Sequence, residues 1–499
     1  MQKLHSIIPG LAFLTVLVSQ ALNGQESLKT MSLNLQNAVD LAIHQSSSVM
    51  YTQNRNVNYY WRYKNYLSMY RPQLNLNGEF PNYTQSATPI IQPDGSVEFK
   101  QVYNMLGSAR LSLNQSIPQL GTYVYAATSI YRAQDFKLDK VDFSGSPFNI
   151  GFVQPLLAYN SMKWRKLTEP MVYEEAQKEF VESIERICQN TTVRFFRYLR
   201  AQTDNKLAES NLKNSENNLR IAESKRELGK ISENDFSRIK LSVYNAQKAQ
   251  NKAHMDLKNA DFELKSYIGL DQDQEIELVI PLDILFFEID PDIAVKEAKE
   301  NRKETPQFER RLIEAEEALV QAKRSSGVNA TLMGSYGISN SSDEFLLVYN
   351  NPERQRLLSL TVSVPIMDWG RAASRIKLAE SRSDLVNFDV EKEKIDFERE
   401  VIVQVEQFNL LIDWINTAEE ADKVAENGYQ IALKKFQNGE ISITDLNISL
   451  QERESAKRDY IASLQSYWVA YYNLRILTLY DFQRNEKISY YNPMLKDQN

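Results

Sequence analysis

The sequence predicts a mainly α-helical protein with a β-sheet contribution, built from two similar β-β-α-α halves. Three observations support this fold class: an internal duplication, two 68-residue stretches with helical patterning, and short segments in which apolar and polar residues alternate. The length of 499 residues would allow several domains. A duplication on this scale instead favours one elongated body made of two related halves.

The duplication consists of short matched motifs at constant spacing. Two pairs of motifs lie 210 residues apart and two pairs lie 256 residues apart, so the first copy carries 46 extra residues between Gly78 and Pro155. A repeat of this length is a duplicated half-domain rather than a solenoid unit. The matched residues are Pro155 with Pro365, Gly229 with Gly439, Ala38 with Ala294, and Leu76 with Leu332.

Each half is predicted to contain an opening helix, a long helix and a return helix. The long helices would each span about 100 Å at 1.5 Å per residue, and the return helices make each half a hairpin. The predicted ranges are 35–70, 161–228 and 232–268 in the first half, and 293–324, 371–438 and 442–482 in the second.

The long helix of the second half carries an apolar seam. Its apolar residues advance in steps of three, four or seven, the pattern of a coiled coil. The positions between them are mostly charged or carry amides, so the opposite face is expected to meet water. The seam residues are Phe397, Val401, Val405, Phe408, Leu411, Ile415, Ala418, Ala425, Tyr429, Ala432 and Phe436.

Local turn chemistry specifies both hairpin tips. A glycine that can adopt the left-handed conformation ends each long helix, and a Ser-x-x-Asp capping box begins each return helix. These residues are Gly229, Ser232 and Asp235 in the first tip and Gly439, Ser442 and Asp445 in the second.

Segments between the opening and long helices have strand character. In the second half, the segments that contain Val328 and Leu358 alternate apolar and polar residues over roughly 10 positions, as membrane strands do between lipid and a wet lumen. The extra residues of the first half are expected to add a β-hairpin, with turns at 118–121 and 137–147. An ordinary soluble antiparallel sheet is the alternative interpretation.

The strands of one chain are too few to close a barrel. Their edges would be unpaired in lipid, where no water can satisfy backbone groups. Closure of a pore therefore requires several copies of the chain.

The first residues predict a secretory signal peptide, residues 1–24. Lys3 precedes an apolar run over residues 7–18, and small residues follow at Ala21 and Gly24, so the exact cleavage site stays open. The single Cys188 lies in a helical apolar pattern and is expected to pack as a small hydrophobe.

Composition and motifs argue against several classes of function. A net charge of −7 with scattered Lys and Arg offers no basic stripe for nucleic acid. His44 and His254 have no Cys or carboxylates at metal-ligand spacing, and no phosphate-binding loop or hydrolase nucleophile motif is present. We therefore expect no catalytic residue, no metal and no cofactor.

The tryptophans suit two roles. Trp164 and Trp369 follow predicted strands, where an interfacial aromatic belt is plausible. Trp414 and Trp468 lie within predicted helices, where core packing is expected.

Taken together, these residues give a chain that resembles the TolC family of trimeric outer-membrane efflux and secretion channels, over nearly its whole mature length. The resemblance rests on the duplicated halves, on the junction Gln154-Pro155-Leu156-Leu157 with its partner Val364-Pro365-Ile366, and on the tip pattern over residues 436–446. It implies a homotrimer with a β-barrel in the outer membrane and a periplasmic α-barrel of antiparallel coiled-coil hairpins. It also implies as partners outer-membrane lipid, a periplasmic adaptor (membrane fusion) protein, and an inner-membrane transporter of the RND, ABC or MFS type.

The resemblance places adaptor docking at the hairpin tips. Its aperture carboxylates match Asp235 and Asp445, which a capping role at a helix start also explains. Ile441 stands where some relatives have a basic residue, and Phe436 where they have Tyr, so the aperture contacts must differ. The docking residues implied are Gly229, Lys230, Ile231, Ser232, Gly439, Glu440, Ile441 and Ser442.

The predicted function is a passive channel of a tripartite efflux pump or a type I secretion system in a Gram-negative outer membrane. The alternative is a periplasmic coiled-coil adaptor or scaffold without a pore. The family default is about four strands per chain, which the extra hairpin could raise to six, and the exported substrate stays open. The predicted segments are 25–71 (opening helix), 72–157 (strands), 158–270 (hairpin), 271–325 (linker and opening helix), 326–367 (strands), 368–482 (hairpin) and 483–499 (tail).

Overall fold

The computed structural model describes residues 31–282, 284 and 287–496, which fall into two compact units. The predicted signal peptide, residues 1–24, lies outside the described residues. Unit 1 holds the described residues up to 51 together with 184–289 and 406–476, and unit 2 holds 52–183, 290–405 and the residues from 477 onward.

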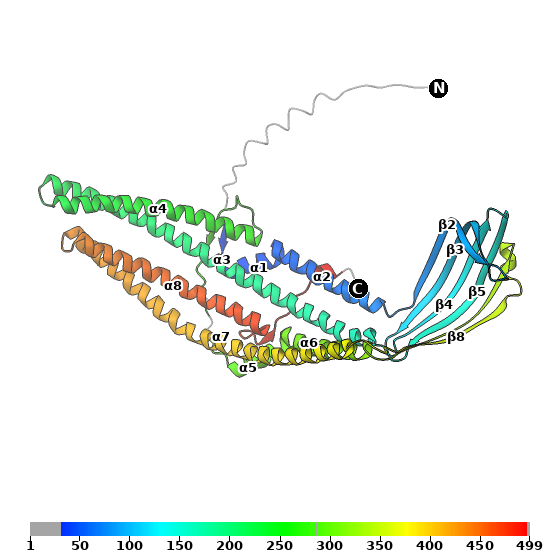
Figure 1. Cartoon of the computed structure of the whole chain (residues 1–499). Coiled ribbons are helices and arrows are strands. Elements are labelled where there is room, and N and C mark those ends of the chain that lie inside the picture. Colours follow the sequence, from blue (N-terminus) through cyan, green and yellow to red (C-terminus); the bar gives the residue numbers. More distant parts are fainter. Residues whose placement is uncertain (1–30, 283, 285–286, 497–499) are drawn as a thin grey trace, which may run out of the picture. The chain divides into compact units, whose positions relative to one another are not determined.

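Unit 2 contains an antiparallel sheet of six strands, in the order β2-β3-β4-β5-β7-β8. The strands lie side by side and bend together (Figure 1). The extra hairpin of the first half is β3 with β4, and it belongs to the same sheet. The strands are β2 Gln73–Ile91, β3 Val97–Ile117, β4 Thr122–Asp135, β5 Lys140–Pro155, β7 Asn329–Ser342 and β8 Glu353–Ser363.

The two faces of this sheet differ in polarity, as the alternation predicted. Residues opposite each other on neighbouring strands share a face, so the register assigns every side chain to one of two faces. The apolar face includes Leu74, Leu76, Leu111, Leu113, Ala126, Ile150, Phe152, Leu332, Leu358, Leu360 and Val362. The polar face includes Asn75, Asn77, Arg110, Ser112, Asn114, Ala127, Asn149, Ser335, Ser359 and Thr361.

Exposure differs between the two faces at some positions only, because Asn75, Arg110 and Thr361 on the polar face are exposed as well. On the apolar face Leu76 and Leu358 are 73% and 76% exposed, whereas Ser112 and Ala127 on the polar face are 5% and 9% exposed. Large apolar side chains such as Leu76 and Leu358 are thus exposed on one face, as in a wall with lipid on its apolar side.

The opening helices are broken, which corrects the prediction of one continuous helix in each half. The first is α1 Leu35–Gln45 and α2 Ser47–Ser68, and the second is α5 Pro291–Asn301 and α6 Glu304–Ser325. The residues at the breaks, Ser46 and Arg302, lie 256 positions apart and both have extended backbones. The Ser46 hydroxyl accepts a hydrogen bond from the backbone N–H of Val49 at 3.1 Å and so begins α2.

The helical hairpins match the predicted ranges closely. They consist of α3 Ser161–Glu227 with α4 Glu233–Ile268, and α7 Arg371–Asn438 with α8 Ile443–Thr478 (Figure 1). The return helix α8 ends four residues before the predicted end at 482, because Leu479 has a φ of +49° and the chain turns into a short strand pair. That pair is β9 Tyr480–Asp481 with β10 Glu486–Lys487.

Burial along α7 confirms the apolar seam. Val401, Val405 and Phe408 are 0% exposed, and Phe195 and Phe196 of α3 are also 0% exposed. Cys188 is buried, as expected of a small hydrophobe. The remaining short elements are β1 Met31–Leu33, paired in parallel with β6 Ile276–Leu278, and the 3₁₀ helices η1 Phe345–Tyr349 and η2 Pro493–Leu495.

One prediction about α7 is wrong. The face opposite the seam is exposed as expected, although it also carries Leu410, Val424 and Ile431, which are each more than half exposed. Trp414 belongs to this exposed set at 64% and is not a core residue of the chain. Charged neighbours at the intervening positions hid this second stripe from the sequence pattern.

The other tryptophans behave differently from one another. Trp369 is 92% exposed beyond the end of β8, and Trp164 is half-buried near the start of α3. Trp468 is half-buried and its ring contacts Tyr467 and Tyr471. None of the helices in the described part of the chain is long and apolar enough to cross a bilayer.

Candidate functional site: the hairpin tips

The two hairpin tips end their long helices in the same way. Gly229 has a φ of +68° and Gly439 a φ of +83°, values that favour glycine. The N–H of Lys230 donates to the carbonyl of Lys225 at 2.8 Å, and the N–H of Glu440 donates to the carbonyl of Lys435 at 2.9 Å. The N–H groups of Gly229 and Gly439 also donate to the carbonyls of Arg226 and Phe436, each at 2.9 Å. Both tips are therefore Schellman motifs, which satisfy the last carbonyls of α3 and α7.

Each return helix begins with a serine cap. The hydroxyl of Ser232 accepts from the N–H of Asp235 at 3.0 Å, and that of Ser442 accepts from the N–H of Asp445 at 3.2 Å. Each hydroxyl also donates to the carboxylate of its aspartate at 2.7 Å. The capping role predicted for both aspartates is therefore present.

The second tip carries the more complete cap. The backbone N–H of Ser442 donates to the Asp445 carboxylate at 3.1 Å. Hydrogen bonds from the Ser442 hydroxyl and N–H to the charged form lower the pKa of Asp445 below its usual value. Asp445 thus stays ionised at the start of α8, where the helix dipole also favours a negative charge.

An apolar cluster of unit 1 holds the two tips together. Ile239 of α4, Tyr429 of α7 and Leu446 of α8 are buried in it. Ile231 and Ile441, two of the predicted docking residues, are half-buried and pack against the same cluster. These isoleucines therefore have a structural role in addition to any contact with a partner.

The other predicted docking residues are exposed. Gly229, Lys230 and Ser232 form the outer surface of the first tip, and Gly439, Glu440 and Ser442 that of the second. The structure thus brings all eight residues onto two adjoining turns with opposite charges at matching positions, Lys230 and Glu440.

An ion pair stiffens the first tip across its turn. Arg226 at the end of α3 donates to the Glu233 carboxylate at 2.8 Å. Its guanidinium also lies 4.5 Å from the centre of the Phe236 ring. Both ionic partners are well exposed, so this pair positions the turn more than it stabilises the fold.

Sequence reasoning missed a polar belt that joins the two hairpins above the tips. Asn211 of α3 accepts from Arg453 of α8 at 3.2 Å and donates to Glu454, and Asn214 donates to the hydroxyl of Tyr429 at 3.1 Å. Arg453 covers the Tyr429 ring at 4.1 Å. Asparagines in a coiled-coil seam fix which helices pair and in which register. Asn211 and Asn214 were therefore the sequence signal that could have predicted this belt.

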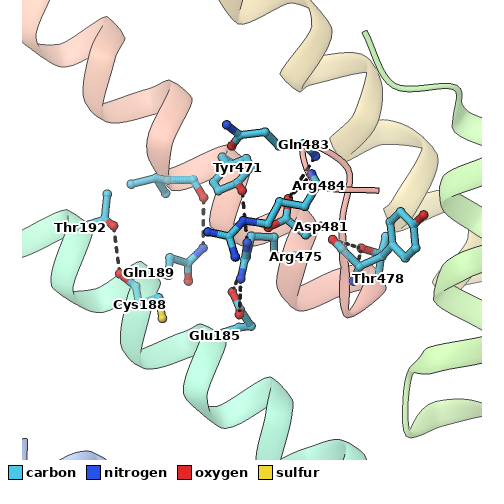
Figure 2. A network of polar contacts seen from close by, with 12 residues as sticks. Glu185, Cys188, Gln189, Thr192, Tyr471, Arg475, Thr478, Asp481, Gln483 and Arg484 are labelled. Carbon is cyan, nitrogen blue, oxygen red and sulfur yellow. Dashed lines mark hydrogen bonds and ion pairs between the residues drawn. The ribbon is translucent and has the colours of Figure 1, made fainter. Parts of the chain in front are cut away.

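A second polar network, also missed, links the same helices farther from the tips. Figure 2 shows Arg475 of α8 directed at Glu185 of α3, and its guanidinium donates to both carboxylate oxygens at 2.8 Å. The Tyr471 hydroxyl accepts from Arg475 at 3.2 Å, and Glu185 is 0% exposed. Replacing either partner of this bidentate pair would destabilise the fold, because the remaining charge would be buried without a counter-charge.

A long groove of about 1310 Å³ lies between α3, α4 and α8 in unit 1. Small residues of α4 line it at helical spacing, namely Ala246, Ala249 and Ala253. Polar side chains such as Asp204 of α3 and Gln451 of α8 complete the wall, and the groove reaches Ile443 and Thr444 at the second tip.

The described residues contain no group of three or more His, Cys, Asp or Glu side chains that could hold a metal ion. At both turns the serine hydroxyl donates to the aspartate of its own capping box, so these side chains serve helix capping.

Comparison with known proteins identifies the fold. Residues 294–478 match the family model described as outer membrane efflux protein. That range runs from the opening helix to the end of α8 in the second half. No curated protein matches the sequence.

Solved structures resemble about nine-tenths of the chain. A membrane protein from Pseudomonas aeruginosa is similar with a TM-score of 0.63 and 16% identity, over 89% of this chain and 90% of that one. The outer membrane channel CmeC of Campylobacter jejuni gives 0.65 and 13%, over 93% and 88%. The outer membrane protein VceC of Vibrio cholerae gives 0.60 and 12%, over 89% and 95%.

These findings confirm the resemblance to TolC-type channels. Over about nine-tenths of its length the chain has the fold of the outer-membrane efflux channels, and over residues 294–478 it also matches their family model.

Proposed function

We propose that this protein is the outer-membrane channel component of a tripartite efflux pump or a type I secretion system. It is a passive homotrimeric conduit through the periplasm and the outer membrane. This proposal rests on one observation. A single chain leaves the edges of its sheet unpaired and leaves apolar side chains of its outer helices exposed.

The sheet is open at both edges. Within the described chain, β2 and β8 each have one neighbouring strand, so their outer backbone groups find no partner in the sheet. The sheet also exposes one continuous apolar face. An open edge in lipid costs several kcal/mol for each unpaired group. Pairing β8 of one copy with β2 of the next removes both edges.

The helical layer of unit 1 is open in the same sense. Its outer helices are α4 and α7 (Figure 1), and both expose apolar side chains along one side. On α4 these are Leu241, Tyr244, Met255 and Phe262, and on α7 they are Leu410, Trp414, Val424 and Ile431. Packing α7 of one copy against α4 of the next would bury both stripes in a coiled-coil contact.

The tips are the proposed docking site for a periplasmic adaptor protein. Lys230 and Glu440 give the two turns opposite charges, and the groove between α3, α4 and α8 offers a surface for an adaptor helix. The adaptor would connect the channel to an inner-membrane transporter of the RND, ABC or MFS type, which supplies the energy for export.

Asp235 and Asp445 are proposed to act at the aperture as well as in capping. Three copies of each would make rings of negative charge at the tips, which attract cations and repel anions. Export then requires the tips to move apart while their Schellman turns stay intact.

A periplasmic scaffold without a pore is the weaker hypothesis. It would leave the apolar face of the sheet in contact with water, an exposure that soluble proteins avoid. It also gives no role to the strands that complete the sheet.

Membrane extraction followed by reconstitution tests the proposal. The protein should stay with outer membranes in high salt, dissolve in mild detergent, and give stepwise ion conductance in a planar bilayer. Release by salt, or detergent-extracted protein without conductance, would favour the scaffold.

A further inference from the structure

We infer that the outer-membrane barrel of this protein has 18 strands, six from each of three copies. The inference takes the trimer from the proposed function. It adds the number of strands in the barrel and therefore the width of the pore. It follows from the place of one hairpin in the sheet.

The duplication locates this hairpin as an insertion. The 256-residue offset relates Ile91 to Leu347, and the 210-residue offset relates Leu138 to Val348. Leu347 and Val348 are adjacent in the second half, so residues 92–137 have no counterpart there. This segment holds β3 and β4, whereas β2 and β5 correspond to β7 and β8.

The inserted hairpin is part of the wall and not a plug. β3 pairs with β2 from Asn114 to Val97, with Leu113 opposite Leu74, and β4 pairs with β5 with Ala126 opposite Ile150. Leu111 and Leu113 continue the apolar face, and Arg110 and Ser112 continue the polar face. A plug inside the lumen would show neither continuous pairing nor this alternation.

The ends of the sheet allow closure without further strands. β2 follows α2 and runs away from the helices, whereas β8 runs back toward α7. A seam between β8 of one copy and β2 of the next is therefore antiparallel, like the pairings within the chain. Three copies then close an even-numbered barrel, as membrane barrels require.

The extra strands change what the barrel can pass. Barrel diameter grows roughly linearly with strand number, so 18 strands give a pore about 1.5 times as wide as 12 strands would. Barrels of 16–18 strands leave an aqueous channel, and rings of Asn75, Arg110 and Asn149 would line this one. Selection of cargo by size therefore falls to the helical tips and not to the barrel.

Electron microscopy of the detergent-extracted trimer tests the inference directly. The barrel viewed along its axis should show 18 strands. A variant that lacks residues 92–137 is the matched comparison, because it joins β2 to β5 as the second half joins β7 to β8. Its trimer should have 12 strands and a barrel narrower by about a third.

The possible results separate the inference from the proposed function. A wild-type trimer with 12 strands in the wall, and β3 with β4 outside it, would overturn the inference and leave the channel assignment intact. Particles that are not closed rings would overturn the proposed function itself. The wild-type image decides even where the deletion variant fails to fold.

Discussion

At the scale of single residues, the hairpin tips depend on backbone conformations that few residue types can adopt. Gly439 needs its left-handed φ, and the nearest atom to a Cβ at this position would be Nζ of Lys225 at 3.8 Å. Space is therefore no obstacle at this turn, and the backbone conformation alone selects glycine.

Replacing Gly439 with valine should disrupt the second tip and lower export severalfold while the trimer still assembles. A non-glycine residue pays about 1–2 kcal/mol in this conformation, and β-branching adds to the cost. Gly95→Val is the control, because Gly95 also has a positive φ, +85°, with open space around it, but lies in the turn between β2 and β3. Export would be measured as efflux of a fluorescent dye from cells. Normal efflux by the Gly439→Val protein would remove the docking role from this turn.

The Asp445 cap should make the first turn of α8 sensitive to pH. Hydrogen bonds from Ser442 lower the pKa of Asp445 in the folded protein. A lowered folded pKa means that the carboxylate stabilises the turn above its unfolded pKa of about 3.9, and that this contribution is lost as pH falls through the folded pKa.

Hydrogen-exchange protection of residues 443–446 measures this effect. Protection in the wild type should fall below about pH 4, whereas Asp445→Asn should show low protection without this acid step. An equal acid response in both proteins would assign the effect to other carboxylates.

Sequence alone could predict the capping residues but not their long-range partners. Gly229, Ser232 and Asp235 act through bonds to residues within a few positions, so the local pattern is sufficient. Arg475 meets Glu185 290 positions earlier, and Asn211 meets Arg453 242 positions later. Those pairings depend on which helices become neighbours, which only the fold decides.

At the scale of elements, the second apolar stripe of α7 is the feature that most needs a partner. Trp414 and Leu410 are exposed on a helix whose other side is already packed. The sequence pattern favoured one seam with a solvated opposite face, and the structure shows exposed apolar side chains on that second side of α7.

Trp414→Glu should weaken trimer assembly without unfolding the chain. A charge in the predicted α7–α4 contact would be desolvated without a partner, which costs several kcal/mol at each of three contacts. Asn416→Glu is the control, because Asn416 is exposed on a different side of the same helix. Sedimentation in detergent would show monomers for the first variant and trimers for the second. Trimers from both would place the subunit contact elsewhere.

Val362→Arg should reduce membrane insertion by about 2–4 kcal/mol if the side chain lies near the bilayer midplane. Val362 is 53% exposed on the apolar face of the sheet, and its neighbour Thr361 lies on the polar face. Thr361→Arg is therefore a control that places the same charge in the lumen. Insertion would be followed by refolding into lipid vesicles. Equal insertion of both variants would mean that the faces are assigned wrongly.

Element boundaries show where sequence patterns lose information. The long helices could be predicted to within a residue because their ends carry glycine or capping serine. Neither glycine nor proline stands at the breaks at Ser46 and Arg302. The helical periodicity of the apolar residues continues through both positions, so one continuous helix was predicted in each half. The strand number could not be settled either, since pairing of the extra hairpin with its neighbours depends on register.

At the scale of the whole molecule, the duplication sets the architecture. Each half supplies strands and a helical hairpin, and the halves differ chiefly by the insertion in the first. The predicted division of the chain into functional segments, including the tail 483–499, remains a prediction. The two halves of one chain leave the edge strands β2 and β8 unpaired, and pairing between three copies of the chain would close the barrel.

Mass measurement of the intact protein in mild detergent tests the central claim most directly. The account predicts a single species three times the mass of the mature chain, stable at low concentration and able to conduct ions after reconstitution. A stable, non-conducting monomer would show that one chain buries its edges in some other way and would contradict the account.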